Sequence, residues 1–197
     1  KFAVIGNPVS HSLSPDIHLF FASQFQLERY TYNKIKSNEN DFERDINDFF
    51  KNGGVGLNVT VPFKGLAYNL CDELDQSAGL CKSVNTVLID SGKLIGHSTD
   101  GQGLIDDFLH KEITLEDSKI LIIGAGGSAA SIISSLLSHG KIKEISILNR
   151  TKSNALRLLD LFETNRLLMH EEGDEYDIVI NTTPISMNVD DIILPPE

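Results

Sequence analysis

The sequence predicts an α/β protein with two open-sheet domains. Short apolar runs alternate with helical stretches along the chain, which is the pattern of parallel strands joined by helices. The alternation occurs in two cycles, and the break between them falls near residue 101. The 197 residues, of which 41% are hydrophobic and 23% charged, are enough for one or two buried cores. We therefore expect one domain over residues 1–100 and a second over 101–197, each built on a parallel sheet.

The first half is expected to begin with a buried strand and a helix. The apolar run FAVIG predicts the strand, and Ser14 and Pro15 suit the N-cap and the first position of the helix. The alternating run YTYNKIK predicts the next strand, and Gly53 suits the end of the helix that follows it. Two later strands flank the dipeptide SG and predict a hairpin. In order, we expect strands at 2–6, 30–36, 55–62, 84–90 and 93–99, helices at 14–25, 41–53 and 101–111, and short helical segments up to residue 81.

The second half repeats the alternation of strand and helix. The runs KILIIG and EISILN predict buried strands, and a helical stretch follows each of them. In order, we expect strands at 119–124, 144–149 and 176–183 and helices at 128–138 and 152–163. No element is predicted for residues 163–175, which form a short connection.

The charge and cysteine content exclude several classes of function. The net charge of −11 and the pI of about 4.9 give a surface that does not attract nucleic acid or an anionic membrane. No apolar run reaches the ~18–20 residues of a membrane span, and no signal peptide is visible, so we expect a cytoplasmic protein. The spacing of Cys71 and Cys81 fits no common metal motif. We expect reduced structural thiols and no metal, with a disulfide as the open alternative.

A glycine-rich turn in the second half predicts a nucleotide site. Gly124, Gly126 and Gly127 stand between a predicted strand and a predicted helix in KILIIGAGGSAASIISSLL. Glycines allow a tight turn and let backbone N–H groups approach a pyrophosphate, while the helix N-terminus favours the anion. The alternative is an ordinary tight turn, because many strand–helix junctions need glycine.

The end of the next strand favours NADP over NAD. NAD sites usually place Asp or Glu about 20 residues after the glycines, where it binds the ribose 2′-hydroxyl. This chain has Asn149, Arg150, Thr151 and Lys152 there, so no carboxylate repels a 2′-phosphate. Arg150 can stack on adenine and pair with the phosphate, and Thr151 can donate a hydrogen bond. Alternatively, Arg150 and Lys152 are solvated residues at a helix start.

Polar side chains gather at predicted strand ends in the first half. In open α/β sheets these ends form the ligand crevice, and hydroxyls and amides there suit a substrate with hydroxyl groups and a carboxylate. Each residue also has a purely structural alternative: a helix cap for Ser14 and Asp100, turn bonding for the asparagines and solvation for Lys64. The candidate substrate residues are Ser12, Ser14, Asn58, Thr60, Lys64, Asn85 and Asp100.

These residues lie in motifs that resemble the shikimate dehydrogenase family. GNPVSHSLSP, GLNVTVPFK, SVNTV and STDGQG occur in that order before GAGGSA and NRT, and NTTPIS precedes Met187. The resemblance extends from Phe2 to about Met187. It implies a substrate-binding α/β domain followed by a Rossmann-like NADP-binding domain. It also implies an NADP-dependent enzyme of aromatic amino acid biosynthesis that interconverts 3-dehydroshikimate and shikimate by hydride transfer, as a monomer or homodimer.

The resemblance also implies roles for individual residues. Ser12 and Ser14 would bind the substrate carboxylate, and Lys64 and Asp100 would be the catalytic pair. The positions that would hold the ring hydroxyls are Asn58, Thr60, Asn85 and Asp100. The positions that would bind NADP are Gly124, Ala125, Gly126, Gly127, Ser128, Ala129, Asn149, Arg150, Thr151, Lys152, Thr182, Thr183 and Met187.

The chain departs from the family pattern in three places. Ser186 replaces a glycine before the methionine, and Ser98 stands where asparagine is common. Family members also continue with more of the cofactor domain and a segment that brings a glutamine to the substrate, so the resemblance implies that the C-terminal part is missing here. Two other functions stay open: a relative that acts on quinate, in one version with NAD, and a ligand-binding protein without catalysis. Intact Lys64 and Asp100 argue against the second.

Overall fold

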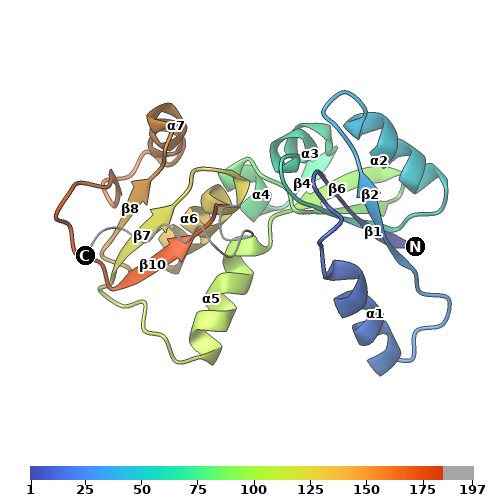
Figure 1. Ribbon diagram of the computed structural model, residues 1–197, viewed down its shortest axis with the longest axis horizontal. Helices are drawn as coiled ribbons and strands as arrows, with labels where there is room; N and C mark the ends of the chain where they lie inside the picture. Colours follow the sequence, from blue (N-terminus) through green and yellow to red (C-terminus); the bar gives the residue numbers. More distant parts are fainter. Residues whose placement is uncertain (184–197) are drawn as a thin grey trace. The chain divides into compact units, whose positions relative to one another are not determined.

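The computed structural model describes residues 1–183 (Figure 1). The chain divides between Asp100 and Gly101 into two compact units. The first unit contains one six-stranded sheet and the second contains one four-stranded sheet. The prediction of an α/β protein with two open sheets is confirmed.

The sheet of the first unit is mixed, which corrects the prediction of a parallel sheet. β1 (Phe2–Gly6) pairs in parallel with β2 (Tyr32–Lys36) and β3 (Gly56–Val59). β5 (Thr86–Asp90) is antiparallel to β3, and β6 (Lys93–His97) is antiparallel to β5. The hairpin of β5 and β6 around Ser91–Gly92 confirms the prediction made from the dipeptide SG, since so short a turn can join only antiparallel strands. The short β4 (Glu73–Leu74), which was not predicted, completes the order β2-β1-β3-β5-β6-β4.

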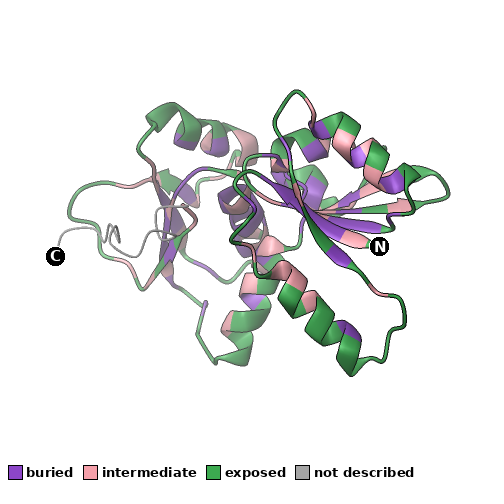
Figure 2. Cartoon of the chain, turned by 45° about the vertical axis from the view of Figure 1, so that its right-hand side comes forward, coloured by how far each residue is buried: buried purple, intermediate pink, exposed green. Residues whose placement is uncertain are grey.

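Helices cover both faces of this sheet, and the buried residues concentrate on the strands (Figure 2). α2 (Phe42–Lys51) buries Phe42, Ile46 and Phe50, which lie four residues apart on one helical face. They pack with residues of β1 and β3, of α3 (Lys64–Leu70) and of α4 (Gln76–Cys81) in the main core. A smaller cluster of Val4, Val9 and Tyr32 lies on the other face, and α1 (Ser14–Gln24) contacts β1 and β2.

The start of α1 differs from the prediction. The N-cap residue is Leu13, with no side-chain cap, while Ser14 is the first helical residue and Pro15 the second. The Ser14 Oγ accepts a hydrogen bond from the Ser12 Oγ at 3.1 Å. The prediction that Ser14 caps the helix was therefore wrong, because its hydroxyl bonds to another side chain.

The sheet of the second unit is entirely parallel, as predicted. Its order is β10-β7-β8-β9, with β7 (Lys119–Ile123) in the middle beside β10 (Ile178–Asn181) and β8 (Glu144–Leu148). Strand β9 (Leu167–Met169) lies in the stretch for which no element was predicted, because three residues are too few to show an alternation. The helices are α5 (Asp100–His110), α6 (Gly127–His139) and α7 (Lys152–Phe162).

The described part of the chain offers neither a membrane helix nor a metal cluster. No helix within residues 1–183 is long and apolar enough to cross a membrane. In the same residues no three His, Cys, Asp or Glu side chains are placed to hold a metal ion. Cys71 and Cys81 are both free thiols, and burial raises the pKa of Cys71 to about 11.

The turn between β7 and α6 depends on Gly124. This residue has φ +112°, a conformation that side chains disfavour, and a Cβ there would overlap the Oγ1 of Thr182. The Thr182 N–H and Oγ1 both donate to the Ile123 carbonyl, at 2.8 and 2.9 Å, so the neighbouring backbone cannot move aside easily.

We expect Gly124→Ala to lower the free energy of unfolding by ~1–3 kcal/mol, because it adds backbone strain and a steric overlap. Urea unfolding measures the change. Gly126→Ala is the matched control, since Gly126 has φ −91° and no described atom lies within 4 Å of its added Cβ. Equal losses in the two variants would contradict the account of this turn.

Candidate active site

An ion pair between Lys64 and Asp100 forms the centre of the candidate site. Lys64 is the first residue of α3, directly after the turn that follows β3, and Asp100 is the first residue of α5. The Lys64 Nζ bonds the Asp100 Oδ2, and the two side chains are 11% and 26% exposed. Lys64 is therefore not a solvated surface lysine. The pair joins an ammonium donor to a carboxylate in a place that is only partly open to water.

Asn85 links this pair to the rest of the site. Its Nδ2 donates to the Asp100 Oδ1 at 2.5 Å, and its Oδ1 accepts the backbone N–H of Thr99 at 3.0 Å. A backbone N–H can only donate and a carboxylate can only accept. These two partners therefore fix which end of the Asn85 amide faces Asp100.

The fixed orientation of the Asn85 amide determines which of the neighbouring groups donate hydrogen bonds and which accept them. Since the Asn85 Oδ1 accepts, the Thr86 hydroxyl donates to it at 3.2 Å. The Thr86 Oγ1 then accepts from the Asn58 Nδ2 at 3.2 Å, and the Asn58 Oδ1 accepts from the Tyr32 hydroxyl at 2.6 Å. We call the six residues of this continuous hydrogen-bonded series the polar row: Tyr32, Asn58, Thr86, Asn85, Asp100 and Lys64.

The polar row includes two residues that sequence reasoning missed. Tyr32 and Thr86 stand on strands, and tyrosine and threonine are common strand residues, so sequence reasoning did not single them out. Tyr32 is only 5% exposed and stacks on His18 with ring centroids 4.4 Å apart. Burial raises the pKa of Tyr32 to about 12, so its hydroxyl stays protonated and available as a donor. Against the effect of burial, the nearby Ser14 hydroxyl acts to lower the pKa of Tyr32.

Ser12 and Ser14 lie next to the polar row, where the Ser14 hydroxyl is close to Tyr32. The loop that carries Ser12 is held in place by Lys34, whose Nζ donates to the Ser10 carbonyl at 2.5 Å, and by Asn7, whose Nδ2 donates to the Ser37 carbonyl at 3.0 Å. Six of the seven predicted substrate residues thus lie in or next to one network. They are Ser12, Ser14, Asn58, Lys64, Asn85 and Asp100.

Thr60 is the seventh predicted substrate residue. It follows β3, where its backbone N–H bonds the Ile5 carbonyl at 2.9 Å and its carbonyl accepts the N–H of Phe63 at 3.0 Å. These bonds fix the turn before Lys64. Within residues 1–183 the Thr60 side chain forms no hydrogen bond with the polar row.

The arrangement suits a small ligand with several oxygens. Hydroxyl and amide groups in a row can bind ring hydroxyls, and the serine hydroxyls can bind a carboxylate. The ammonium of Lys64 can stabilise a developing negative charge and transfer a proton, while Asp100 can hold Lys64 in place. The chemistry that fits best is acid–base assistance to a reaction at a hydroxyl or carbonyl carbon.

The second unit carries the residues predicted to hold a nucleotide. The turn Gly124–Gly127 leads from β7 into α6, and its first glycine is needed for the tight path described above. The N–H groups in the first turn of a helix have no carbonyl partner within the helix, so this terminus suits a phosphate. Ala125 is buried and Ala129 is completely so, whereas Gly126 is exposed.

The predicted 2′-phosphate residues lie between β8 and α7. Arg150, Thr151 and Lys152 are exposed, and the Asn149 Nδ2 donates to the Thr151 carbonyl at 2.9 Å, which closes the turn. Thr182 and Thr183 follow β10, the strand beside β7, where the strand order reverses and nucleotides bind in open sheets. These residues fit a dinucleotide with a 2′-phosphate. Met187 and Ser186 lie outside the described residues.

Two family models match the chain. Residues 4–87 match the shikimate dehydrogenase substrate binding domain, and residues 108–190 match shikimate / quinate 5-dehydrogenase. The matches thus cover parts of both units.

Individual relatives agree with these models. A shikimate dehydrogenase (NADP(+)) of Acinetobacter baumannii (strain ACICU) is 41% identical, over 99% of this chain and 76% of its own length. The crystal structure of shikimate dehydrogenase from Aquifex aeolicus is 29% identical, with a TM-score of 0.88 over 98% of this chain and 71% of its own. Shikimate 5-dehydrogenase from Thermus thermophilus, in complex with NADP(H) and shikimate, is 31% identical, with a TM-score of 0.82 over 93% of this chain and 68% of its own.

We expect Tyr32→Phe to lower the free energy of unfolding at pH 7 by ~1 kcal/mol, because the variant loses a hydrogen bond. The raised pKa of Tyr32 adds a pH dependence. The stability that the protonated hydroxyl provides is fully present below pH 10, the ordinary tyrosine pKa, and is lost as the pH rises toward about 12. The gap between wild type and variant should therefore narrow from pH 7 to pH 11.

Urea unfolding at the two pH values measures this gap. Tyr30→Phe is the control at pH 7, because Tyr30 stacks on Phe2 at 4.8 Å and stands outside the polar row. A gap that stays constant or widens between pH 7 and pH 11 would show that the Tyr32 hydroxyl is not buried as described.

Proposed function

This chain belongs to the shikimate dehydrogenase family, and on that premise we propose that it catalyses the reversible NADP-dependent interconversion of 3-dehydroshikimate and shikimate. The reaction belongs to the biosynthesis of aromatic amino acids. The observation that carries the proposal is the polar row, which ends in the Lys64–Asp100 pair. Ligand binding alone would not need an ammonium and a carboxylate in direct contact at the end of a row of neutral groups.

We assign substrate binding to the first unit and cofactor binding to the second. Residues 1–100 form the substrate-binding and catalytic domain, and residues 101–197 belong to the NADP-binding domain. The clustering of the polar row within the first unit supports the first assignment, and the parallel sheet with its glycine turn supports the second. A cytoplasmic location and a monomeric or homodimeric state stay predictions from the sequence.

Within the first unit, the substrate would lie along the polar row. The hydroxyls of Ser12 and Ser14 would donate hydrogen bonds to the substrate carboxylate, because neutral donors can bind an anion without a buried countercharge. Asn58, Asn85 and Asp100 would bind the ring hydroxyls, with Thr60 beside them. Most of these groups are hydrogen-bonded before the substrate arrives, so little side-chain order has to be gained on binding.

Lys64 and Asp100 would perform the acid–base part of the reaction. When a ketone is reduced, negative charge develops on its oxygen. The Lys64 ammonium would stabilise that charge and donate a proton, and in the reverse direction it would accept the proton of the hydroxyl. The carboxylate of Asp100 would hold the ammonium in position and accept a hydrogen bond from the same hydroxyl.

The residues of the second unit would hold NADP, which when bound supplies the hydride to the ring carbon or receives it. Gly124–Gly127 and the N-terminus of α6 would bind the pyrophosphate, and Thr182 and Thr183 would line the site after β10. Arg150 would pair with the 2′-phosphate, with Asn149, Thr151 and Lys152 around it.

The direct test is the absorbance of NADPH formed by the protein from NADP⁺ and shikimate. We expect turnover with this pair, less turnover with NAD⁺, and a loss of ~10²–10⁴-fold in Lys64→Ala with little change in NADP affinity. Lys93→Ala is the control, because Lys93 forms an exposed ion pair with Glu73 at 2.6 Å in the same unit.

Equal turnover of quinate would assign the protein to a broader quinate/shikimate activity. Shikimate binding without turnover would refute the proposed catalysis.

We expect Arg150→Ala to raise the KM for NADP⁺ by ~10- to 100-fold, which corresponds to the ~1.5–3 kcal/mol of a hydrogen bond to a charged group. The KM for NAD⁺ should stay nearly constant, because NAD⁺ has no 2′-phosphate. Arg157→Ala serves as the control, since Arg157 is an exposed residue further along α7. If both KM values rise equally, Arg150 does not bind the 2′-phosphate.

A further inference from the structure

The segment that leads into Asp100 is held by contacts outside any strand or helix. β6 ends at His97 and α5 begins at Asp100, so Ser98 and Thr99 lie between the two elements. The Asp100 carboxylate must lie against the Lys64 ammonium for the proposed chemistry. The backbone positions of these two intervening residues therefore help to set where that carboxylate lies, together with the bond from the Asn85 amide to Asp100.

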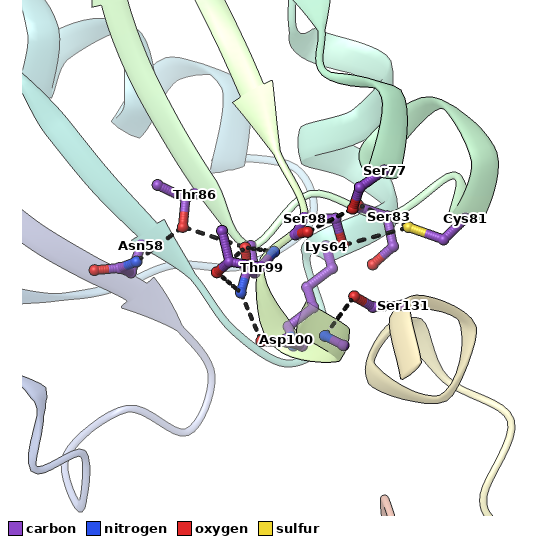
Figure 3. A network of polar contacts seen from close by, with 12 residues as sticks. Asn58, Lys64, Ser77, Cys81, Ser83, Thr86, Ser98, Thr99, Asp100 and Ser131 are labelled. Atoms are coloured by element: carbon purple, nitrogen blue, oxygen red, sulfur yellow. Dashed lines mark hydrogen bonds and ion pairs between the residues drawn. The ribbon is translucent and has the colours of Figure 1, made fainter. Parts of the chain in front are cut away.

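Each intervening residue is bonded by a side chain from another part of the unit (Figure 3). The Thr99 N–H donates to the Asn85 Oδ1 at 3.0 Å, as described above. The Ser98 carbonyl accepts the hydroxyl of Ser77 at 2.5 Å. Ser98 is 3% exposed, so water could not easily replace the Ser77 hydroxyl as the hydrogen-bond donor to this carbonyl.

Ser77 is well placed for this contact because α4 is fastened to the end of β6. The Asp75 N–H donates to the Gly96 carbonyl at 2.9 Å, and the Asp75 Oδ2 lies 3.3 Å from the His97 Nδ1. The other carboxylate oxygen caps α4 by accepting the Ala78 N–H at 2.6 Å. These bonds stop at His97, whereas the Ser77 hydroxyl reaches one residue further, to Ser98.

A second, weaker contact comes from the other end of α4. The Cys81 thiol donates to the Ser98 hydroxyl at 3.3 Å and is also within reach of the Ser83 carbonyl at 3.4 Å. Burial raises the pKa of Cys81, so the thiol stays protonated and can donate. A thiol is a weak donor, and the hydroxyl of Ser77 therefore contributes more to holding this residue.

We propose that Ser77 is a positioning residue of the reaction proposed above: by holding the Ser98 carbonyl, it fixes Asp100 against Lys64. The inference rests on the proposed function and adds a residue that stands outside the polar row. Misplacement by about 1 Å can cost ~10²-fold in rate, which makes a partial shift visible in kcat.

The experiment measures kcat and KM for Ser77→Ala with shikimate and NADP⁺. We expect kcat to fall by ~10-fold, while both KM values stay within ~2-fold, because the groups that bind the substrate are left in place. Ser77→Thr keeps the hydroxyl and should restore most of kcat. Ser138→Ala is the matched control, since its hydroxyl bonds the Ser134 carbonyl at 2.8 Å in the second unit.

A double-mutant cycle with Asp100→Asn separates positioning from a general loss of structure. If Ser77 acts through Asp100, Ser77→Ala should change kcat by less than ~2-fold in the Asp100→Asn background. Three results would overturn the role of Ser77 and leave the proposed function standing: an unchanged kcat in Ser77→Ala, the same fall of kcat in Ser138→Ala, or full additivity in the cycle. A wild-type protein without shikimate turnover would overturn the proposed function, and the role of Ser77 with it.

Discussion

The contact between the Lys64 ammonium and the Asp100 carboxylate is the constraint on which the rest of the site depends. Two charges that are largely withdrawn from water need partners, and the carboxylate can only accept hydrogen bonds. Asp100 therefore sets the direction of the Asn85 amide, and through Thr86 and Asn58 it sets the direction of the Tyr32 hydroxyl. The Asp100 carboxylate, together with the Thr99 N–H, thus orders neutral groups that lie on three different strands.

The mixed sheet of the first unit makes this series possible. Asn58 on β3 lies directly opposite Thr86 on β5 because these strands are antiparallel, so their side chains share a face of the sheet. The same register gives the alternate residues Leu57 and Val87 to the main core on the other face. The hairpin then brings the end of β6 beside Asn85, whose N–H bonds the His97 carbonyl at 3.0 Å. One face of the sheet thus supplies stability and the other supplies the polar row.

In the second unit, backbone groups rather than side chains make up most of the predicted ligand site. Its predicted ligand groups are a helix N-terminus and a glycine turn, and the strand order reverses beside them, between β7 and β10. The positive φ of Gly124 and its closeness to Thr182 show that the fold itself requires a glycine at this position, whether or not a ligand binds there. Among the predicted nucleotide residues that the structure describes, those with charged side chains lie after β8, where Arg150 and Lys152 are exposed.

The sequence by itself determined the alternation of strands and helices, the glycine turn, the basic residues after β8 and most members of the site. These features are local: they depend on periodicity, on special backbone needs or on motifs that keep their order along the chain. Only the tertiary structure decided the antiparallel pairing of β3 with β5 and the short strand β9. It also decided the contacts of Tyr32 and Ser77. Tyr32 and Asn58 are 26 residues apart, and Ser77 and Ser98 are 21 apart, so strand register and helix packing bring them together. No local pattern records such a distance, because a buried tyrosine on a strand and a serine on a short helix have the same sequence appearance whether or not they bond a distant residue.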